Sequence, residues 1–261
     1  MTPEDRLLVA LDVETLGDAD RLLDRLAGVV TGCKIGSQLF TAAGPVAVEH
    51  ALKRGVRVFL DLKFHDIPNT VAGAVREATR LGVFMLTVHA SGGTAVMRAA
   101  AQAAAAAARE LGVQRPLCLG VTVLTSLDRA HLQRDLGIAS TVEAHVLHLA
   151  ERAREAGLDG CVASPREIRP LRSLMPRSWV IATPGVRPAG AGADDQARTA
   201  TPAAAIAAGA DYLVVGRPIT AAADPVAAAR AILDEMVRGG AERSLSARPA
   251  IGVRAAASRS S

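Results

Sequence analysis

Charged side chains at the ends of apolar segments are the residues of this sequence whose types and spacing could do chemistry. Asp12 ends the run LeuLeuValAlaLeuAsp, and Lys34 ends a second apolar run. Asp61 and Lys63 end a third, and because residues i and i+2 of a strand share a face, they should point the same way. Burial of such a cluster is costly unless its charges are paired, and alternating Lys and Asp would pair them.

Lysine is scarce in this chain, because only Lys34, Lys53 and Lys63 are found among its 30 basic residues. A lysine can give up a proton near neutral pH, which a guanidinium cannot, so a retained lysine hints at proton transfer. Chance retention also explains any one of the three.

Asp66 continues the charged run three residues beyond Lys63, and His65 beside it permits a metal-site interpretation. We favour no metal, because a lysine among the carboxylates would repel a divalent ion, and we expect His65 to have a packing role. Thr70 is expected to cap the helix that follows Pro68.

Two further segments, ThrProGlyValArgPro (183–188) and TyrLeuValValGlyArgPro (212–218), combine glycine and arginine after apolar runs. Glycine lets backbone N–H groups approach an anion, and arginine adds a charge-assisted fork. Gly216 and Arg217 together with Arg187 therefore indicate a phosphorylated ligand, although Arg187 could also be an ordinary surface arginine.

These residues need a scaffold, and the sequence alternates short β-rich runs with helical stretches. Eight such repeats in about 240 residues favour an α/β fold, a closed (β/α)₈ TIM barrel. A doubly wound open sheet is less favoured, because no Gly-x-Gly-x-x-Gly follows the first predicted strand of this sequence. The predicted strands are Leu7–Asp12, Val30–Ile35, Val56–Leu62, Val83–His89, Leu117–Val123, Gly160–Ala163, Trp179–Ala182 and Tyr212–Val215. The predicted helices are Ala19–Leu26, Val71–Leu81, Ala95–Leu111, Thr141–Ala156 and Pro202–Ala208.

We expect one barrel domain over residues 1–240 and a disordered Arg/Ala/Ser tail over 241–261. The connections 124–140 and 183–201 are longer than packing requires, and both follow strands at the end where barrels hold their sites. Long loops there are more often lids or ligand clamps than padding.

Composition excludes several classes of protein. No apolar run reaches the roughly 18 residues of a membrane span, and the polar N-terminus is not typical of a signal peptide. Three widely spaced cysteines, Cys33, Cys118 and Cys161, are expected to be reduced core residues of a cytoplasmic protein. The pI of 9.4 reflects four arginines in the last 19 residues, so a near-neutral body with one Tyr and one Trp does not predict nucleic-acid binding.

The ten residues AspLeuLysPheHisAspIleProAsnThr (61–70) closely resemble the signature of orotidine 5′-phosphate decarboxylases. The resemblance continues through LeuValAlaLeuAsp (8–12), CysLysIleGly (33–36), PheThrAlaAlaGlyPro (40–45) and ValThrValLeuThrSer (121–126) to ThrProGlyValArgPro and ValGlyArgProIle. It covers about residues 5–236. The Asp-x-Lys-x-x-Asp core alone also occurs in sugar-phosphate decarboxylases and aldolases, and the extension PheHisAspIleProAsnThr makes the match specific.

The resemblance implies a cytoplasmic homodimer that decarboxylates orotidine 5′-phosphate to UMP, without metal or cofactor, at active sites shared between subunits. It implies that Lys34, Asp61 and Lys63 form a charged chain with Asp66 of the partner subunit, and that Lys63 protonates the product. The implied substrate contacts are these four residues, Asp12 at the ribose, Ile67 and Thr70 at the subunit boundary, Thr125 and Ser126 at the pyrimidine, Gln196 as a bridge between pyrimidine and phosphate, and Arg187, Gly216 and Arg217 at the phosphate.

Two other interpretations stay open at this point. A magnesium-dependent sugar-phosphate decarboxylase or aldolase on the same barrel would need metal and act on a linear sugar phosphate. A non-catalytic nucleotide-binding barrel would bind UMP without turnover, but it would gain nothing from buried like-sign crowding.

Overall fold

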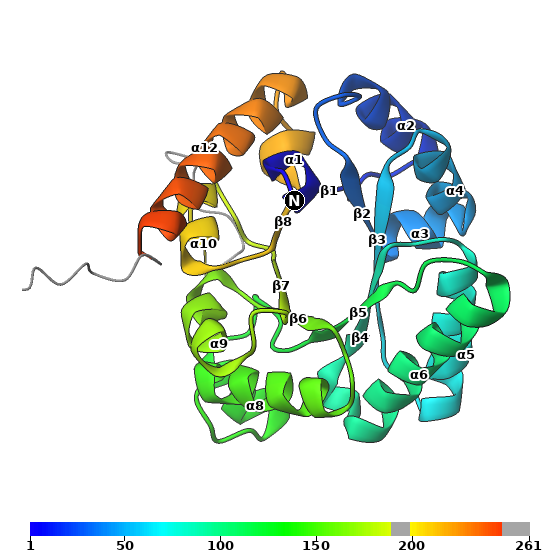
Figure 1. Cartoon of the computed structure of the whole chain (residues 1–261), viewed down its shortest axis with the longest axis vertical. Helices are drawn as coiled ribbons and strands as arrows, with labels where there is room; N and C mark the ends of the chain where they lie inside the picture. The colour runs from blue at the N-terminus through cyan, green and yellow to red at the C-terminus, as the bar shows by residue number, and fades with distance from the viewer. Residues whose placement is uncertain (189–198, 247–261) are drawn as a thin grey trace, which may run out of the picture.

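The computed structural model describes residues 1–188 and 199–246, and this part of the chain alternates strands and helices around a closed barrel (Figure 1). Its strands are β1 (Leu7–Ala10), β2 (Gly32–Gly36), β3 (Arg57–Phe64), β4 (Met85–His89), β5 (Leu117–Val121), β6 (Gly160–Val162), β7 (Val180–Thr183) and β8 (Tyr212–Val215). Its longer helices are α2 (Leu16–Arg25), α3 (Ser37–Ala43), α4 (Val46–Lys53), α5 (Pro68–Arg80), α6 (Thr94–Leu111), α7 (Arg129–Leu136), α8 (Val142–Glu155), α9 (Ile168–Leu174), α10 (Pro202–Ala208) and α12 (Pro225–Ser246). Short helical segments complete it: α1 (Pro3–Arg6), η1 (Ala90–Gly92), η2 (Pro165–Glu167) and α11 (Arg217–Thr220).

Each strand pairs in parallel with its neighbours in sequence, and β1 closes the barrel against β8. This confirms the predicted (β/α)₈ architecture. β1 ends at Ala10 rather than at the predicted Asp12, although the Leu11 N–H still donates to the Lys34 carbonyl at 2.9 Å. Asp12 thus lies just beyond the strand, at the C-terminal end of the barrel.

The barrel interior is filled in layers by every second residue of the strands. An apolar layer contains Leu8, Phe59, Met85, Leu119 and Tyr212, all buried. Two interior positions are glycine. A Cβ at residue 160 would lie 2.2 Å from the Val180 carbonyl oxygen, so this position must be glycine, and a Cβ at residue 32 would lie 2.6 Å from Leu8 Cδ2, so the Leu8 side chain would have to move. Two residues further along β2 and β3, the same alternation brings Lys34 and Asp61 to the inner face.

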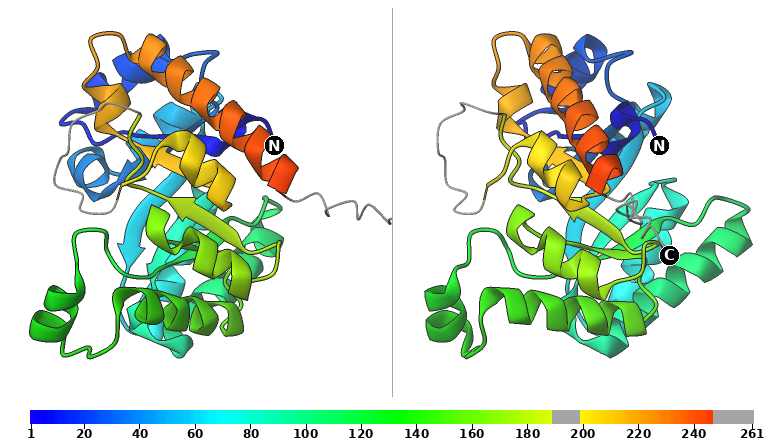
Figure 2. Two further views of the ribbon diagram at one scale, coloured as in Figure 1. Left: turned by 90° about the vertical axis from the view of Figure 1, so that its left-hand side faces the viewer. Right: turned by 60° about the vertical axis from the view of Figure 1, so that its left-hand side comes forward.

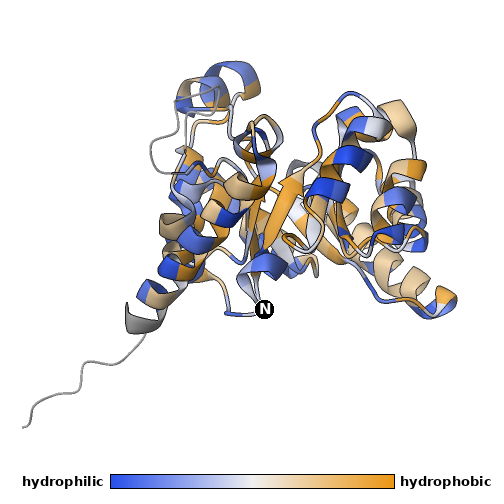
Figure 3. Cartoon of the chain, turned by 90° about the horizontal axis from the view of Figure 1, so that it is seen from above, coloured by the Kyte–Doolittle hydropathy of each residue, from blue (hydrophilic) through white to orange (hydrophobic). Residues whose placement is uncertain are grey.

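The helices cover the outside of the barrel and bury a larger apolar cluster against the strands (Figures 2 and 3). The Ala-rich α6 illustrates how: Ala100, Ala104 and Ala107 recur at helical spacing and are fully buried. The small side chains let α6 pack closely against the strands. The five helices predicted from the sequence agree with the observed helices to within a few residues.

Two sequence-based expectations differ from the structure. Thr70 does not cap α5, because Ile67 is the N-cap, without a side-chain cap bond, and Pro68 begins the helix. Pro at the first helical position has the φ a helix needs and no N–H to satisfy, so it sets the boundary. α12 continues to Ser246, so residues 241–246 are helical rather than part of a disordered tail. The long connection 124–140 contains the additional helix α7, which Asp128 caps.

The three cysteines are free and buried, as predicted. Burial raises the pKa of each of the thiols of Cys33, Cys118 and Cys161 to about 12, so these thiols are not nucleophiles. Within residues 1–188 and 199–246, no helix is long and apolar enough to cross a membrane. In the same ranges no cluster of three or more His, Cys, Asp or Glu side chains could hold a metal ion.

Candidate functional site

A row of alternating charges lies at the C-terminal ends of β1, β2 and β3; we call Asp12, Lys34, Asp61 and Lys63 the charged row. Lys34 Nζ lies 3.0 Å from Asp12 Oδ1 and 3.7 Å from Asp61 Oδ2. Lys63 Nζ donates to Asp61 Oδ2 at 2.8 Å. Lys34 and Asp61 are each only 8% exposed, so the pairing predicted from their alternation is what compensates the loss of hydration.

Lys63 does not reach this position by the simple strand alternation expected from sequence. Its φ is 52°, and among the described residues it is the one non-glycine residue with positive φ. Register shifts between Leu60, which faces Leu86, and Phe64, which faces Val88, so three residues of β3 stand opposite one residue of β4. This β-bulge turns Lys63 so that its ammonium meets the carboxylate of Asp61.

The β4 residue that stands opposite the bulge is Thr87, which the sequence analysis missed. Its side chain is fully buried, its hydroxyl donates to Asp61 Oδ1 at 3.0 Å, and it accepts the backbone N–H of Lys63 at 2.9 Å. Strand alternation could have found it, because Thr87 is two residues beyond the interior residue Met85. The sequence did not indicate a role for Thr87, because a neutral threonine in an apolar strand is common and its charged partners lie on another strand.

Gly36 is a second residue that the sequence analysis did not single out. A Cβ at this position would lie 2.7 Å from Lys34 Nζ and 3.2 Å from Asp12 Oδ1. The missing side chain therefore provides the space in which these two charges meet. The signal was present in the CysLysIleGly motif, where glycine follows the lysine by two positions and so shares its face.

The charged row forms one wall of a cavity of about 230 Å³ whose other walls are largely apolar. Its lining includes Asp12, Lys34, Phe59, Asp61, Lys63, Val121, Val123, Leu124, Thr125, Val162, Ala163, Pro184 and Val214. We call it the apolar-walled cavity. Thr125 thus lines the same cavity as the charged row, whereas Ser126 is exposed and lies outside this lining.

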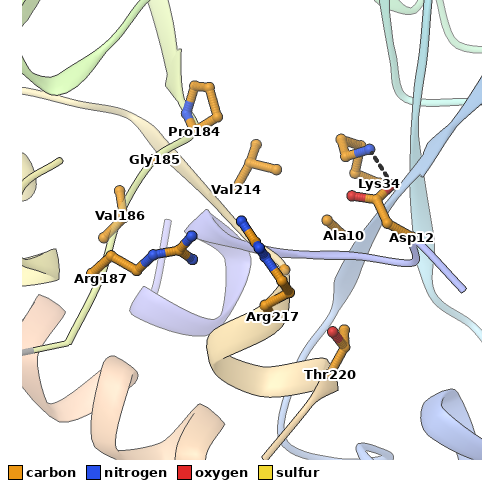
Figure 4. Close-up of a pocket in the computed structure, with 11 residues that line it drawn as sticks. Ala10, Asp12, Lys34, Pro184, Gly185, Val186, Arg187, Val214, Arg217 and Thr220 are labelled. Atoms are coloured by element: carbon orange, nitrogen blue, oxygen red, sulfur yellow. Dashed lines mark hydrogen bonds and ion pairs between the residues drawn. The ribbon is translucent and has the colours of Figure 1, made fainter. Parts of the chain in front are cut away.

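A second cavity of about 350 Å³ adjoins the first, since Asp12 and Lys34 line both. We call it the arginine cavity. In Figure 4 the guanidinium groups of Arg187 and Arg217 both point into it, opposite the Lys34–Asp12 pair. Gly216 and Thr220 also line it, and Thr220 was not predicted. The predicted phosphate-binding residues therefore converge next to the charged row.

The segment from His65 to Thr70 lies apart from both cavities. All six of its residues are exposed, and Ile67 is 66% exposed although apolar. Asp66 accepts the N–H of Ile67 at 2.6 Å and, with Thr70, lines a third cavity of about 340 Å³ that Lys63 also borders. Within one chain the structure therefore does not bring Asp66 to Asp61 and Lys34. Gln196 lies outside the described residues.

The two histidines near the bulge are in ring contact, with the centroids of His65 and His89 5.0 Å apart and the ring planes tilted by 34°. Burial, followed by the nearby His65 and Lys63, lowers the pKa of His89 from its ordinary value. His89 is therefore predominantly neutral at pH 7. His65 contacts His89 but is itself exposed, so its expected packing role stays a prediction.

Comparisons with known proteins identify relatives over most of the chain. The family model described as "Orotidine 5'-phosphate decarboxylase / HUMPS family" matches residues 5–232. A protein of Moorella thermoacetica named orotidine 5′-phosphate decarboxylase is 56% identical over 236 residues, which are 90% of this chain and 94% of that protein. One of the same name from Heliobacterium modesticaldum is 49% identical, over 93% of this chain and all of its own length. The crystal structure of orotidine 5′-phosphate decarboxylase from Lactobacillus acidophilus superposes with a TM-score of 0.79 at 35% identity, covering 89% of this chain and 99% of that one.

Proposed function

The chain belongs to the orotidine 5′-phosphate decarboxylase / HUMPS family, and we propose from this that it is a carboxy-lyase that converts orotidine 5′-phosphate to UMP and CO₂. The observation that carries the proposal is the juxtaposition of the two cavities. A lysine–carboxylate pair faces an apolar-walled space sized for a base, and two arginines face the adjoining space where the phosphate of a nucleotide would lie.

Decarboxylation here poses a specific electrostatic problem. When the bond between C6 and the carboxylate breaks, its electron pair stays on C6, and no adjacent carbonyl can delocalise it. A preorganised positive charge must stabilise the carbanion, and an acid must then protonate C6. Lys63 can do both: its ammonium faces the apolar-walled cavity, and its proton can pass to C6, after which the neutral amine takes a proton from solvent.

The other members of the charged row keep Lys63 charged and oriented. Asp61 Oδ2 accepts the Lys63 ammonium at 2.8 Å, and the Asp61 carboxylate would also crowd the negatively charged carboxylate of the substrate. Lys34, between Asp12 and Asp61, balances the two acids, and we assign the ribose hydroxyls to Asp12. Thr125 and Ser126 are assigned to the pyrimidine, and Gln196, which lies outside the described residues, is assigned to a bridge between pyrimidine and phosphate.

The arginine cavity is assigned to the phosphate, with Arg187 and Arg217 as charge-assisted donors and Gly216 allowing close approach of the backbone. Enzymes can accelerate reactions by about 10¹⁷-fold, which corresponds to roughly 23 kcal/mol. One ammonium cannot supply such a change. Binding energy from the phosphate, used to close the connection 124–140 over the substrate, is a source of the remainder. Most of the connection 183–201 lies outside the described residues.

We further propose that the enzyme is a homodimer whose active sites are shared. The exposed segment from His65 to Thr70 supports this, because Ile67 is apolar yet 66% exposed and because Asp66 lies outside both cavities of its own subunit. In the proposed dimer, Asp66, Ile67 and Thr70 of each subunit complete the site of its partner. Three free thiols suit a reducing compartment, and we place the enzyme in the cytoplasm.

The activity is tested by following the loss of absorbance of orotidine 5′-phosphate on addition of chelator-treated protein. We expect full turnover after chelation, with UMP and CO₂ as products. Activity that disappears with the chelator and returns with Mg²⁺, on a linear sugar phosphate, would instead support the sugar-phosphate branch of the family. Tight binding of UMP without turnover of either substrate would support a nucleotide-binding barrel.

The shared site is tested by complementation between Lys63→Ala and Asp66→Ala subunits. Each homodimer should be nearly inactive. After refolding of an equal mixture, random pairing makes about half of the dimers mixed, and each mixed dimer has one doubly mutated site and one native site. Activity should therefore return to about a quarter of the wild-type value. If mass measurement confirms mixed dimers and activity stays absent, Asp66 acts in its own subunit and the shared site is wrong.

A further inference from the structure

The buried hydroxyl of Thr87 joins the two parts of β3 that the bulge separates. Thr87 faces the three residues from Asp61 to Lys63 across the ladder, and its Oγ1 contacts the first through the side chain and the third through the backbone. It donates to Asp61 Oδ1 at 3.0 Å and accepts from the Lys63 N–H at 2.9 Å.

These two bonds determine how the hydroxyl is used. A threonine hydroxyl has one proton to donate, and the Lys63 N–H, which the bulge removes from the strand ladder, needs an acceptor. The lone pair of Oγ1 therefore serves Lys63, and its proton goes to Asp61. Because the residue is fully buried, no water competes for either bond.

The bonds also divide the Asp61 carboxylate between two kinds of partner. Oδ1 is held by Thr87, while Oδ2 accepts Lys63 Nζ at 2.8 Å and lies 3.7 Å from Lys34 Nζ. The rotation of the carboxylate about its Cβ–Cγ bond is thereby set from the side opposite the lysines. The direction of Oδ2, and with it the place of the Lys63 ammonium, follows from that rotation.

The backbone conformation of Lys63 also depends on Thr87. A non-glycine residue at φ 52° is less favourable than in an ordinary strand, and it persists only where surrounding contacts support it. The bond from the Lys63 N–H to Thr87 is such a contact, made at the residue that must adopt this conformation.

From these contacts, and resting on the proposed decarboxylation, we infer that Thr87 is a positioning residue that holds Asp61 and Lys63 in their reactive arrangement without touching the substrate. Thr87 lies outside the linings of the apolar-walled cavity and the arginine cavity, so it acts through the other two residues. Its loss should affect the chemical step and spare the binding of the nucleotide.

The test compares Thr87→Val, which keeps the shape and removes the hydroxyl, with Thr87→Ser, which keeps the hydroxyl. A misplacement of catalytic groups by about 1 Å can cost about 100-fold, so Thr87→Val should lower kcat by about 10- to 100-fold with KM and the UMP Kd within threefold. Exchange of the C6 hydrogen of UMP for deuterium in D₂O should fall in parallel, because it uses the same lysine. Thr87→Ser should recover kcat to within about threefold of wild type.

Thr79→Val is the matched control, because Thr79 is equally buried and its hydroxyl donates at 2.8 Å to the Val75 carbonyl within α5. It should lower Tm and leave kcat unchanged. The inference is overturned if Thr87→Val turns over within threefold of wild type, or if Thr87→Ser is as impaired as Thr87→Val while both are folded. If Thr87→Val does not fold, Thr87→Cys, a weak donor and acceptor, is judged by the same criteria. Absence of turnover in the wild-type protein would instead refute the proposed function itself.

Discussion

The charged row and the arginine cavity share Asp12 and Lys34 but are held in place in different ways. Most of the charged row stands on or beside barrel strands, and its inner members, Lys34 and Asp61, are buried among fixed partners. Arg187 belongs to the connection after β7 and is half-buried, and Arg217 begins the short helix α11 and is exposed.

This difference matches two separate demands of the proposed reaction. Charges that stabilise a transient carbanion are effective only when they need no rearrangement as the reaction proceeds, which favours strands and internal pairing. Groups that capture a phosphate from water must first be accessible, which favours loops, and their binding energy can then be used to stabilise the transition state. The strand side should therefore control kcat, and the loop side should control kcat/KM.

The largest loss of activity should come from removing Lys63, which belongs to the charged row on the strands. We expect Lys63→Ala to lower kcat by more than about 10⁴-fold, because both the stabilising charge and the proton donor are lost. The UMP Kd should change little, since the phosphate and ribose contacts survive. Lys53→Ala removes an exposed lysine that pairs with Glu49 on α4 and serves as the control. Turnover of Lys63→Ala within tenfold of wild type would remove Lys63 from the mechanism.

A smaller loss of activity is expected from removing Arg217, which belongs to the arginine cavity. Arg217→Ala should lower kcat/KM for orotidine 5′-phosphate by about 100- to 1000-fold, or about 3–4 kcal/mol of transition-state stabilisation, because a charge-assisted phosphate contact is lost. Orotidine without phosphate should react slowly with wild type and be nearly indifferent to the mutation. The exposed Arg177, before β7, provides an Arg177→Ala control. Equal sensitivity of both substrates would contradict the phosphate assignment.

The smallest effect sharpens the comparison by disturbing only the space around the charged row. In Gly36→Ala the new Cβ would lie 2.7 Å from Lys34 Nζ, so the ammonium must shift within its pair with Asp12. We expect kcat to fall by about tenfold while Tm changes by only a few degrees. Gly17→Ala on α2 meets only ordinary contacts, the nearest at 3.5 Å, and should leave activity unchanged. An unaltered kcat in Gly36→Ala would show that the row tolerates displacement.

Much of this molecule follows from its sequence. The alternation of apolar strands and amphipathic helices predicted the barrel, because each pattern has the period of its own element and repeated units close in only a few ways. Charged residues at strand ends predicted the row of Asp12, Lys34, Asp61 and Lys63, because parallel strands all end at the same rim. The Gly/Arg segments after β7 and β8 likewise predicted one cavity.

What the sequence could not supply are contacts that depend on register between strands. The bulge at Lys63 and its clamp by Thr87 arise because three residues of β3 face one residue of β4, and no local pattern encodes that pairing. The role of Gly36 depends on how near Lys34 and Asp12 come across two strands. The cap of the helix at Pro68 was misassigned because threonine is a good capping residue by type, whereas the backbone geometry makes Ile67 the N-cap. Local periodicity determined which residues reach the rim of the barrel, and tertiary register decided how they touch, because hydrogen-bond partners lie far apart in the chain and only folding brings them together.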